Sequence, residues 1–237
     1  MSWRLSDTEK QKRKMGTGQG EDYIPYITTS EINSLGTTSV IRDWKTGRGV
    51  HCLSQGEALW YYILRWDDKN IDIREQYPLD VNKTVELAKE MGIKHPQNEK
   101  HVMTTDFLVT ESDGTLHAYS VKVDRNLSKR TLQLLCLEKM YWVTQNVQFK
   151  MLFKTEADEI LAGNIRLVTE FYDKAKVTDW YSNIKHQIAV KRLNIDLSSE
   201  PLTIEYVRHC LRLMENNALR MEESAWRATT LSCLQGW

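Results

Sequence analysis

Long apolar runs are missing from this chain of 237 residues, and no window approaches the roughly 18 apolar residues that a membrane-spanning helix needs. The first residues, Met1 to Asp7, also lack the apolar stretch of a secretory signal. We therefore expect a protein without membrane helices that works in the cytoplasm.

Cysteine is sparse, and its spacing argues against a metal ribbon or a redox pair. None of the cysteines forms a C-x-x-C pair or a zinc-binding spacing. They are widely scattered, at Cys52, Cys136, Cys210 and Cys233. Reduced thiols of a cytosolic protein are the simplest interpretation.

A surplus of positive charge is missing as well, because 32 basic residues balance 32 acidic ones. Most non-specific affinity for nucleic acid comes from neutralising phosphates, so zero net charge argues against tight, unaided DNA binding. Internal repeats and low-complexity tracts are also absent from the sequence. With 41% hydrophobic and 27% charged residues, the composition is that of a globular protein of one large or two small domains.

The N-terminal region is the one part with a basic surplus, since residues 1–50 carry 8 basic and 6 acidic groups. Four basic residues and three glycines within residues 10–20 predict a flexible basic arm, either a solvated tail or a DNA-contacting segment. We assign residues 1–42 to this arm and its lead-in. In the following turn, Lys45 and Arg48 are candidate DNA-binding residues, although the stretch fits a plain hairpin turn equally well.

The stretch from Thr104 to Val123 is the most informative part of the chain. Two short strand-like arms flank Asp113-Gly114, a strong hairpin signal. Asp106 lies on the first arm, and Ser120 and Lys122 share one face of the second because side chains alternate along a strand. We therefore expect a carboxylate and an ammonium group to converge at one edge of a sheet.

A carboxylate beside a lysine is suited to phosphate chemistry. The carboxylate can hold a hard divalent cation that activates water, and the lysine can orient that water or neutralise a phosphate. The same spacing also occurs on the solvated faces of ordinary sheets, so the pair alone does not establish a site.

The elements around this hairpin predict a mixed sheet flanked by helices. Ser54 and Glu57 match a capping box at the start of a helix, so Glu57 could simply cap its own helix. Periodicity and punctuation predict the order α-β-α-β-β-α-β across residues 43–154. The predicted elements run over residues 54–66, 71–77, 82–91, the two hairpin arms, 128–145 and 148–153.

Residues 155–237 change character and form mostly helical patterns, with breaks expected at Gly163, Asp179 and Pro201. A short ribbon or final helix near the end would make this a small winged-helix-like domain. Its 10 basic and 12 acidic groups favour a protein partner over DNA. The candidate anchors for such a partner are Trp226, Leu231, Leu234 and Trp237.

Several ordered motifs between Asp43 and Phe153 together resemble the TnsA family, the endonuclease subunits of heteromeric transposases. They are Ser54-Gln55-Gly56-Glu57, Glu75-Gln76-Tyr77-Pro78-Leu79, Met103-Thr104-Thr105-Asp106-Phe107-Leu108, Ser120-Val121-Lys122 and Leu137-Glu138-Lys139-Met140-Tyr141-Trp142. The resemblance implies a restriction-endonuclease-like α/β core followed by a helical C-terminal domain. It implies cleavage of double-stranded DNA at the 5′ ends of a transposon, beside a DDE transposase, TnsB, and an ATPase regulator, TnsC.

The resemblance also implies the site residues. The family's catalytic glutamate, aspartate and lysine fall on Glu57, Asp106 and Lys122, with one or two Mg²⁺ ions, replaceable by Mn²⁺, between the two carboxylates. The family usually has glutamine at the position of Ser120, whose hydroxyl is a poor direct ligand of Mg²⁺. We expect Ser120 to hold a metal-bound water, and the backbone carbonyl of Val121 to complete the metal site.

Three matters stay open from the sequence alone. Glu138 is either a surface charge paired along its helix or an outer partner of the site. A stand-alone structure-specific or restriction-type nuclease is an alternative function, and an inactive scaffold subunit is another. The pathway of target selection, the end sequences and the oligomeric state are not encoded in any pattern that we recognise.

Overall fold

The computed structural model describes residues 5–32, 37–96 and 101–215. The chain divides into two compact units, Met1–Ala162 and Gly163–Trp237, so the first unit extends beyond the predicted boundary at residue 154. None of the helices in the described ranges is both long and apolar enough to cross a membrane.

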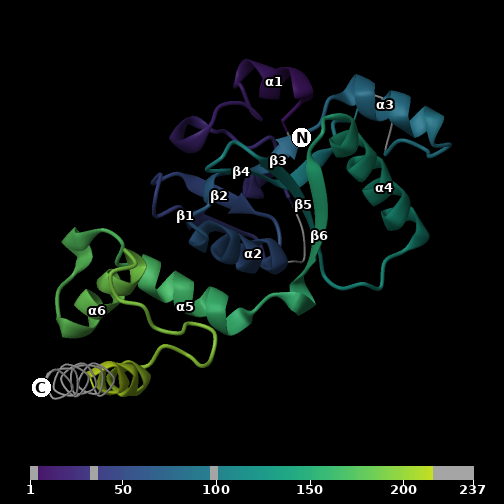
Figure 1. Cartoon of the computed structure of the whole chain (residues 1–237). Helices are drawn as coiled ribbons and strands as arrows, with labels where there is room; N and C mark the ends of the chain where they lie inside the picture. The colour runs from purple at the N-terminus through teal and green to yellow at the C-terminus, as the bar shows by residue number, and fades with distance from the viewer. Residues whose placement is uncertain (1–4, 33–36, 97–100, 216–237) are drawn as a thin grey trace, which may run out of the picture. The chain divides into compact units, whose positions relative to one another are not determined.

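The first unit is built on a four-stranded mixed sheet, as predicted (Figure 1). Its strands are β3 (Asn70–Pro78), β4 (Thr104–Glu111), β5 (Leu116–Lys122) and β6 (Gln148–Phe153), in that order across the sheet. β3, β4 and β5 pair antiparallel, whereas β5 and β6 pair parallel. The parallel pair follows from the intervening helix, because a crossover connection returns the chain to the same end of the sheet.

The predicted hairpin joins β4 and β5. Gly114 has a φ of 86°, which glycine adopts without strain, and the carboxylate of Asp113 accepts a hydrogen bond from the backbone N–H of Thr115 at 2.8 Å. Pairing between the strands runs from Thr110↔Leu116 to Phe107↔Tyr119. Beyond that last pair the two strands separate, and this fork is where the predicted site residues lie.

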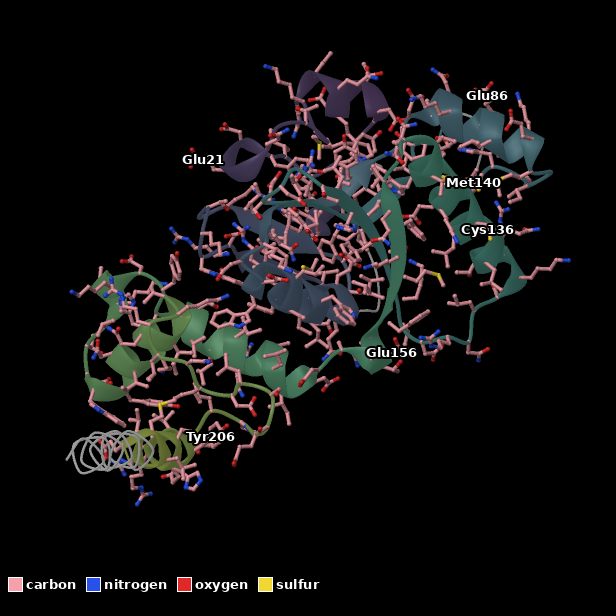
Figure 2. The ribbon with its side chains drawn as sticks, in the orientation of Figure 1. Glu21, Glu86, Cys136, Met140, Glu156 and Tyr206 are labelled. Atoms are coloured by element: carbon pink, nitrogen blue, oxygen red, sulfur yellow. The ribbon has the colours of Figure 1, made fainter. Side chains whose placement is uncertain are left out.

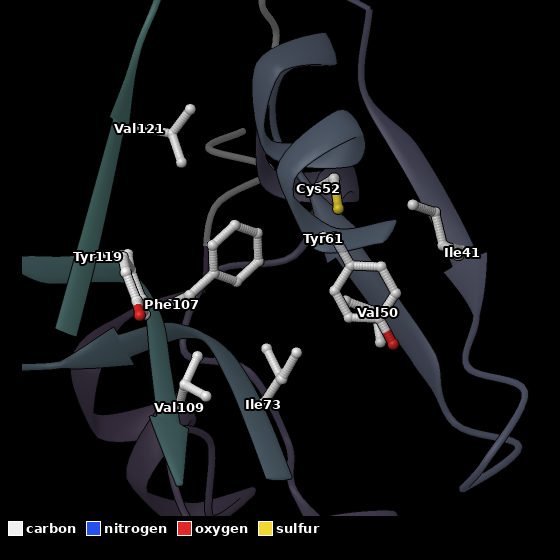
Figure 3. Close-up of a cluster of buried hydrophobic side chains, with 9 residues drawn as sticks. All are labelled: Ile41, Val50, Cys52, Tyr61, Ile73, Phe107, Val109, Tyr119 and Val121. Atoms are coloured by element: carbon white, nitrogen blue, oxygen red, sulfur yellow. The ribbon is translucent and has the colours of Figure 1, made fainter. Parts of the chain in front are cut away.

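One face of the sheet is covered by helix α2 (Gln55–Trp66) together with the hairpin of β1 (Ser39–Arg42) and β2 (Gly49–Cys52) (Figures 1 and 3). Phe107 and Val109 point into this cluster, as alternation along β4 requires. The buried side chains between these elements are Ile41, Val50, Cys52, Tyr61, Ile73, Phe107, Val109, Tyr119 and Val121.

Helices α3 (Val81–Glu90) and α4 (Lys129–Thr144) cover the opposite face. Leu108 and Ala118, which alternate with the residues above, pack there with Leu137 and Trp142 of α4. Side-chain caps begin the three long helices of this unit at Ser54, Asp80 and Ser128. Cys136 and Met140 are exposed on α4 (Figure 2).

The prediction of a flexible N-terminal arm is wrong for the part that the structure describes. Residues 7–31 form a short helix, α1 (Asp7–Lys12), and two 3-10 turns, η1 (Gly20–Asp22) and η2 (Thr29–Glu31). Lys10 is buried, with its ammonium group 2.8 Å from Glu31 and bonded to the carbonyl of Tyr26. Charge composition misled the prediction, because the basic residue finds an acidic partner within the same segment and Met15, Tyr23 and Tyr26 are buried.

This N-terminal segment borders strand β3, which lies at one end of the strand order. The hydroxyl of Tyr23 donates to the carbonyl of Glu75 at 2.8 Å, and the backbone N–H of Tyr26 donates to the carbonyl of Gln76 at 3.3 Å. Gly16 lies so close to Pro78 that an added Cβ would meet the ring at 2.4 Å. The segment therefore satisfies backbone groups of an edge strand that would otherwise need another partner.

The second unit is helical where it is described. Its helices are the greater part of α5 (Glu159–Thr169), α6 (Trp180–Ala189) and a helix over residues 204–215. A 3-10 turn, η4 (Lys174–Lys176), precedes α6, and another, η3 (Lys154–Glu156), precedes α5 in the first unit. The break predicted at Gly163 is wrong, since this residue lies within α5, where a glycine costs only about 1 kcal/mol.

The winged-helix prediction is not confirmed. Between residues 155 and 215, all of which are described, there is no strand. The predicted ribbon and the anchors Trp226, Leu231, Leu234 and Trp237 lie outside the described residues. The side chain of Asn164 organises the loop before the last described helix, donating to the carbonyls of Leu197 and Glu200 and accepting from the N–H of Leu202.

Candidate active site

Asp106 occupies the fork between β4 and β5. Its Oδ2 accepts a hydrogen bond from the backbone N–H of Val121 at 2.6 Å and lies 3.3 Å from the hydroxyl of Ser120. The carboxylate thus takes the place of the next ladder bond once the strands have parted. This arrangement holds one carboxylate oxygen firmly and leaves Oδ1 facing the neighbouring strand, β3.

Lys122 joins this group, as the alternation along β5 predicts. Its Nζ donates to the Ser120 hydroxyl at 2.9 Å and to the Val121 carbonyl at 2.8 Å, and lies 3.5 Å from Asp106 Oδ2. Burial alone would lower the pKa of Lys122, but Asp106 and other nearby acids outweigh it and raise that pKa. The ammonium form is therefore favoured in the site.

Glu57 reaches the site from the first turn of α2, and it also takes part in capping that helix. Ser54 Oγ accepts from the Glu57 N–H and donates to Glu57 Oε1 at 2.9 Å, while Glu57 Oε2 accepts from the Leu53 N–H at 2.9 Å. The side chain is buried, and burial, followed by the charge of Asp106, raises the pKa of Glu57 to about 8. A helix cap alone would not explain a carboxyl held so unfavourably beside a second acid.

Gln76 is the residue of this site to which sequence analysis assigned no role. Its Nε2 lies 3.2 Å from Glu57 Oε2 and 3.5 Å from Asp106 Oδ1, so the amide connects the two carboxylates. Gln76 lies on β3, between the pairs Glu75↔Phe107 and Tyr77↔Thr105. The register of β3 against β4 places Gln76 beside Asp106. Because helix α3 separates these strands in the sequence, no local sequence pattern predicts this contact.

Glu138 lies behind the site on α4. Thr105 donates to Glu138 Oε1 at 2.7 Å and accepts from the Trp142 indole N–H at 2.7 Å. Burial, and then the charge of Asp106, raises the pKa of Glu138 to about 8. Of the two alternatives, a surface charge is wrong because Glu138 is buried. A role as an outer partner of the site stays a prediction, which the hydrogen bond to Thr105, the neighbour of Asp106, supports.

The oxygen donors of this site fit a hard cation that takes few ligands from the protein and keeps several waters. Clusters of three or more His, Cys, Asp or Glu side chains that could hold a metal do not occur within the described ranges. The site offers instead two carboxylates, a carboxamide and the carbonyl of Val121, and Mg²⁺ binds through one or two carboxylates and keeps several waters. The like-charged carboxylates and the raised pKa of Glu57 are what a bound cation would relieve.

The two predicted DNA-binding residues lie elsewhere, around the β1–β2 hairpin. Arg48 is mostly buried, and its Nη1 lies 2.7 Å from Glu75 Oε1, while its Nη2 donates to the carbonyl of Ile73. Lys45 forms an ion pair with Asp68 at 3.2 Å. Arg48 therefore has a structural partner that the turn sequence did not reveal, and contact of either residue with DNA stays a prediction.

Known proteins similar to this chain include transposition endonucleases. Residues 67–154 match the family described as TnsA-like endonuclease N terminal, a stretch that includes Asp106, Ser120 and Lys122. The chain is 36% identical over 159 residues to the Tn7 transposition protein TnsA of Escherichia coli. That similarity covers 65% of this chain and 58% of the Escherichia coli protein, so the chain spans little more than half of this relative.

Proposed function

From its similarity to the TnsA family, we propose that the chain is the DNA endonuclease subunit of a heteromeric transposase. In this proposal it hydrolyses the strand at the 5′ ends of a transposon during cut-and-paste transposition and depends on Mg²⁺. A TnsB-type DDE transposase acts on the 3′ ends, and a TnsC-type ATPase regulates the assembly.

The convergence of Glu57, Asp106 and Lys122 is the observation that carries the proposal. A helix, the first arm of the hairpin and the second arm each contribute one of these residues, and the lysine ammonium lies 3.5 Å from the aspartate. Burial, and then the charge of Asp106, raises the pKa of Glu57 to about 8, and a cation near both carboxylates would offset these effects. Such an arrangement is suited to binding a phosphodiester together with a cation.

Glu57, Asp106 and the carbonyl of Val121 are the groups that would hold the metal. When bound, Mg²⁺ lowers the pKa of water and neutralises charge on the scissile phosphate. Asp106 is positioned for its part by the Val121 N–H and the Ser120 hydroxyl, which fix Oδ2 and so the plane of the carboxylate. Glu57 is positioned by the capping bonds of its own helix.

Lys122 acts in this proposal as a cationic hydrogen-bond donor. Its raised pKa favours the protonated form, so it is better suited to holding a water or a phosphate oxygen than to removing a proton. Ser120 orients the Lys122 side chain, because its hydroxyl accepts a hydrogen bond from Lys122 Nζ at 2.9 Å and donates one to Asp106 Oδ2 at 3.3 Å. This gives Ser120 an orienting role that needs no direct bond to a metal.

Partners supply what the chain lacks for DNA binding. With 32 basic and 32 acidic residues it has no general attraction for the phosphate backbone. We therefore expect the DDE subunit, which must itself recognise the transposon ends, to deliver the 5′ strand to this site. The predicted C-terminal anchors would contact the regulator.

A cleavage assay on duplexes with labelled transposon ends tests the proposal. Wild-type protein with both partners should cut the 5′ strands in Mg²⁺ or Mn²⁺, and chelation should stop the cut. The matched control is Asp106→Ala with the same partners. Efficient cutting by the chain alone would favour the stand-alone nuclease, and intact 5′ strands with wild-type protein and every partner present would favour the inactive scaffold.

A further inference from the structure

We propose that Gln76 is a metal-positioning residue whose side-chain amide turns its oxygen toward a cation shared by Glu57 and Asp106. This inference rests on the proposed metal-dependent function and adds a third protein group to the site. It also assigns a role to a strand, β3, that contributes none of the catalytic or metal-binding residues predicted from the sequence.

The position of the amide is the first observation. Gln76 Nε2 lies within 3.2 Å of Glu57 and 3.5 Å of Asp106, on one oxygen of each carboxylate. A partial positive charge at this point lessens the repulsion between the acids. A cation bound by the same two oxygens would therefore lie next to the side-chain amide of Gln76. Gln76 itself is buried, with 2% of its surface exposed.

The backbone of Gln76 is the second observation. Its φ is 48°, in the left-handed region, which is unfavourable for residues other than glycine. A glycine would adopt this conformation freely. Strain of this kind is kept where the surrounding structure imposes it, and here Tyr26 bonds the Gln76 carbonyl while Tyr23 bonds that of Glu75. The chain therefore holds a glutamine side chain in the site at a conformational cost.

Thr104 provides the means of turning the amide. Its hydroxyl donates to Gln76 Oε1 at 3.1 Å. A hydroxyl can accept as well as donate, so after a half-turn of the amide it can accept from Nε2 instead. Oε1 then faces the two carboxylates, and an amide oxygen is a suitable ligand for a hard cation or for one of its waters. Thr104 keeps one hydrogen bond to the amide in either orientation.

Isothermal titration calorimetry with Mn²⁺ tests this without relying on cleavage. The key variant is Gln76→Gly, which removes the amide and suits the left-handed backbone. Its thermal unfolding, measured without metal, shows whether the variant is folded. Its Mn²⁺ affinity should fall roughly tenfold. Gln76→Glu should instead bind Mn²⁺ more tightly and have a lower unfolding midpoint without metal, because it adds a third carboxylate.

Two further variants keep the test decisive. Thr104→Val should weaken Mn²⁺ binding less than Gln76→Gly does. Should Gln76→Gly fail to fold, Gln76→Asn tolerates the same backbone and withdraws the amide by one methylene, so it should lose affinity in the same way.

Wild-type Mn²⁺ affinity in the folded Gln76→Gly variant, or in Gln76→Asn where that variant replaces it, would overturn the proposal. Asp106→Ala distinguishes this failure from failure of the proposed function. If Asp106→Ala loses Mn²⁺ binding and Gln76→Gly keeps it, only the role of Gln76 is refuted. If wild type and Asp106→Ala bind equally, or neither binds, the metal site itself is refuted.

Discussion

Helix α2 takes part in two buried carboxylate clusters that are built in opposite ways. Near its C-terminal end, Asp43 accepts from the Tyr61 hydroxyl at 2.6 Å and lies 2.8 Å from Arg65 Nε, with further bonds from the backbone N–H groups of Lys45 and Thr46. Burial alone would raise the pKa of Asp43, but Arg65 and these hydrogen bonds outweigh it and lower that pKa. Both oxygens of the Asp43 carboxylate are thus paired within the fold.

At the N-terminal end of α2, Glu57 faces a second acid instead of a base. Its pKa is raised to about 8, and Gln76 and Lys122 only partly compensate the pair that it forms with Asp106. Both clusters are buried and both involve one face of α2, on which Glu57, Tyr61 and Arg65 are four residues apart. The difference teaches that completeness of charge pairing, more than burial, separates a structural carboxylate from a candidate catalytic one.

The largest expected effect comes from Asp106→Ala. Removing this carboxylate should lower 5′-strand cleavage by at least ~10³-fold, because the cation and the lysine both lose their partner. Stability should hold or rise, since Glu57 and Glu138 lose a repulsive neighbour. The measurements are cleavage of labelled ends and thermal unfolding of the same preparation. With a DDE partner, 3′ joining should persist and yield cointegrates, whereas normal 5′ cutting by the variant would refute the site.

Asp43→Ala should have the opposite effects, lowering stability and leaving cleavage nearly unchanged. Arg65 would keep a buried charge without its carboxylate, so the free energy of unfolding should fall by about 3–5 kcal/mol in urea denaturation. Cleavage per folded molecule should change little. The matched control is Asp68→Ala, which breaks the exposed pair with Lys45 and should cost no more than about 1 kcal/mol. Equal losses in the two variants would contradict the comparison.

Glu138→Gln tests whether a buried carboxyl without a basic partner makes the free energy of unfolding depend on pH. The pKa of Glu138 is raised from an ordinary 4.5 to about 8 in the folded protein, so the folded state binds this proton more tightly than the unfolded state. Its contribution to stability is therefore present below pH 4.5 and is lost as the pH rises to about 8, at up to ~1.4 kcal/mol for each pH unit. Unfolding free energies measured at pH 5 and pH 8 should differ less in the variant. An unchanged difference would mean that Glu138 does not titrate in this range.

Ser120→Ala should have the smallest effect of the four. It removes the hydroxyl that bonds Lys122 and Asp106, but it leaves both charged groups and the Val121 N–H in place. We expect single-turnover cleavage to slow roughly tenfold. Ser120→Asp should bind Mn²⁺ more tightly. If Ser120→Ala were as inactive as Asp106→Ala, the hydroxyl would have to contact the reacting groups directly.

Local signals predicted those parts of the fold whose physics is local. The Asp113-Gly114 turn, the cap at Ser128 and the alternation that brings Lys122 to the face of Ser120 each depend on neighbours within a few residues. The capping assignment of Ser54 was correct for the same reason. These features also placed Asp106 and Lys122 close together, because a two-stranded hairpin fixes its own register.

The features that were missed all depend on pairing between residues that are far apart in the sequence. Lys10 was interpreted as part of a flexible basic arm, either solvated or in contact with DNA, yet it is buried against Glu31. Arg48 was interpreted as a candidate DNA contact, yet it pairs with Glu75, twenty-seven residues along the chain. Charge counts cannot show these partners, since they say nothing of which acid a folded chain brings to which base.

By itself, the sequence determined the order of helices and strands from residue 54 to residue 153, the hairpin at the centre of the sheet and the resemblance to the TnsA family. Only the tertiary structure decided that Gln76 joins Glu57 to Asp106, and that Glu138 lies buried behind them rather than at the surface. The reason is physical: local propensity acts over a few residues, whereas the register of β3 on β4 and the burial beneath α4 are set by how whole elements pack. The same packing raises the pKa of Glu57, because burial and a neighbouring charge are properties of a place in the fold.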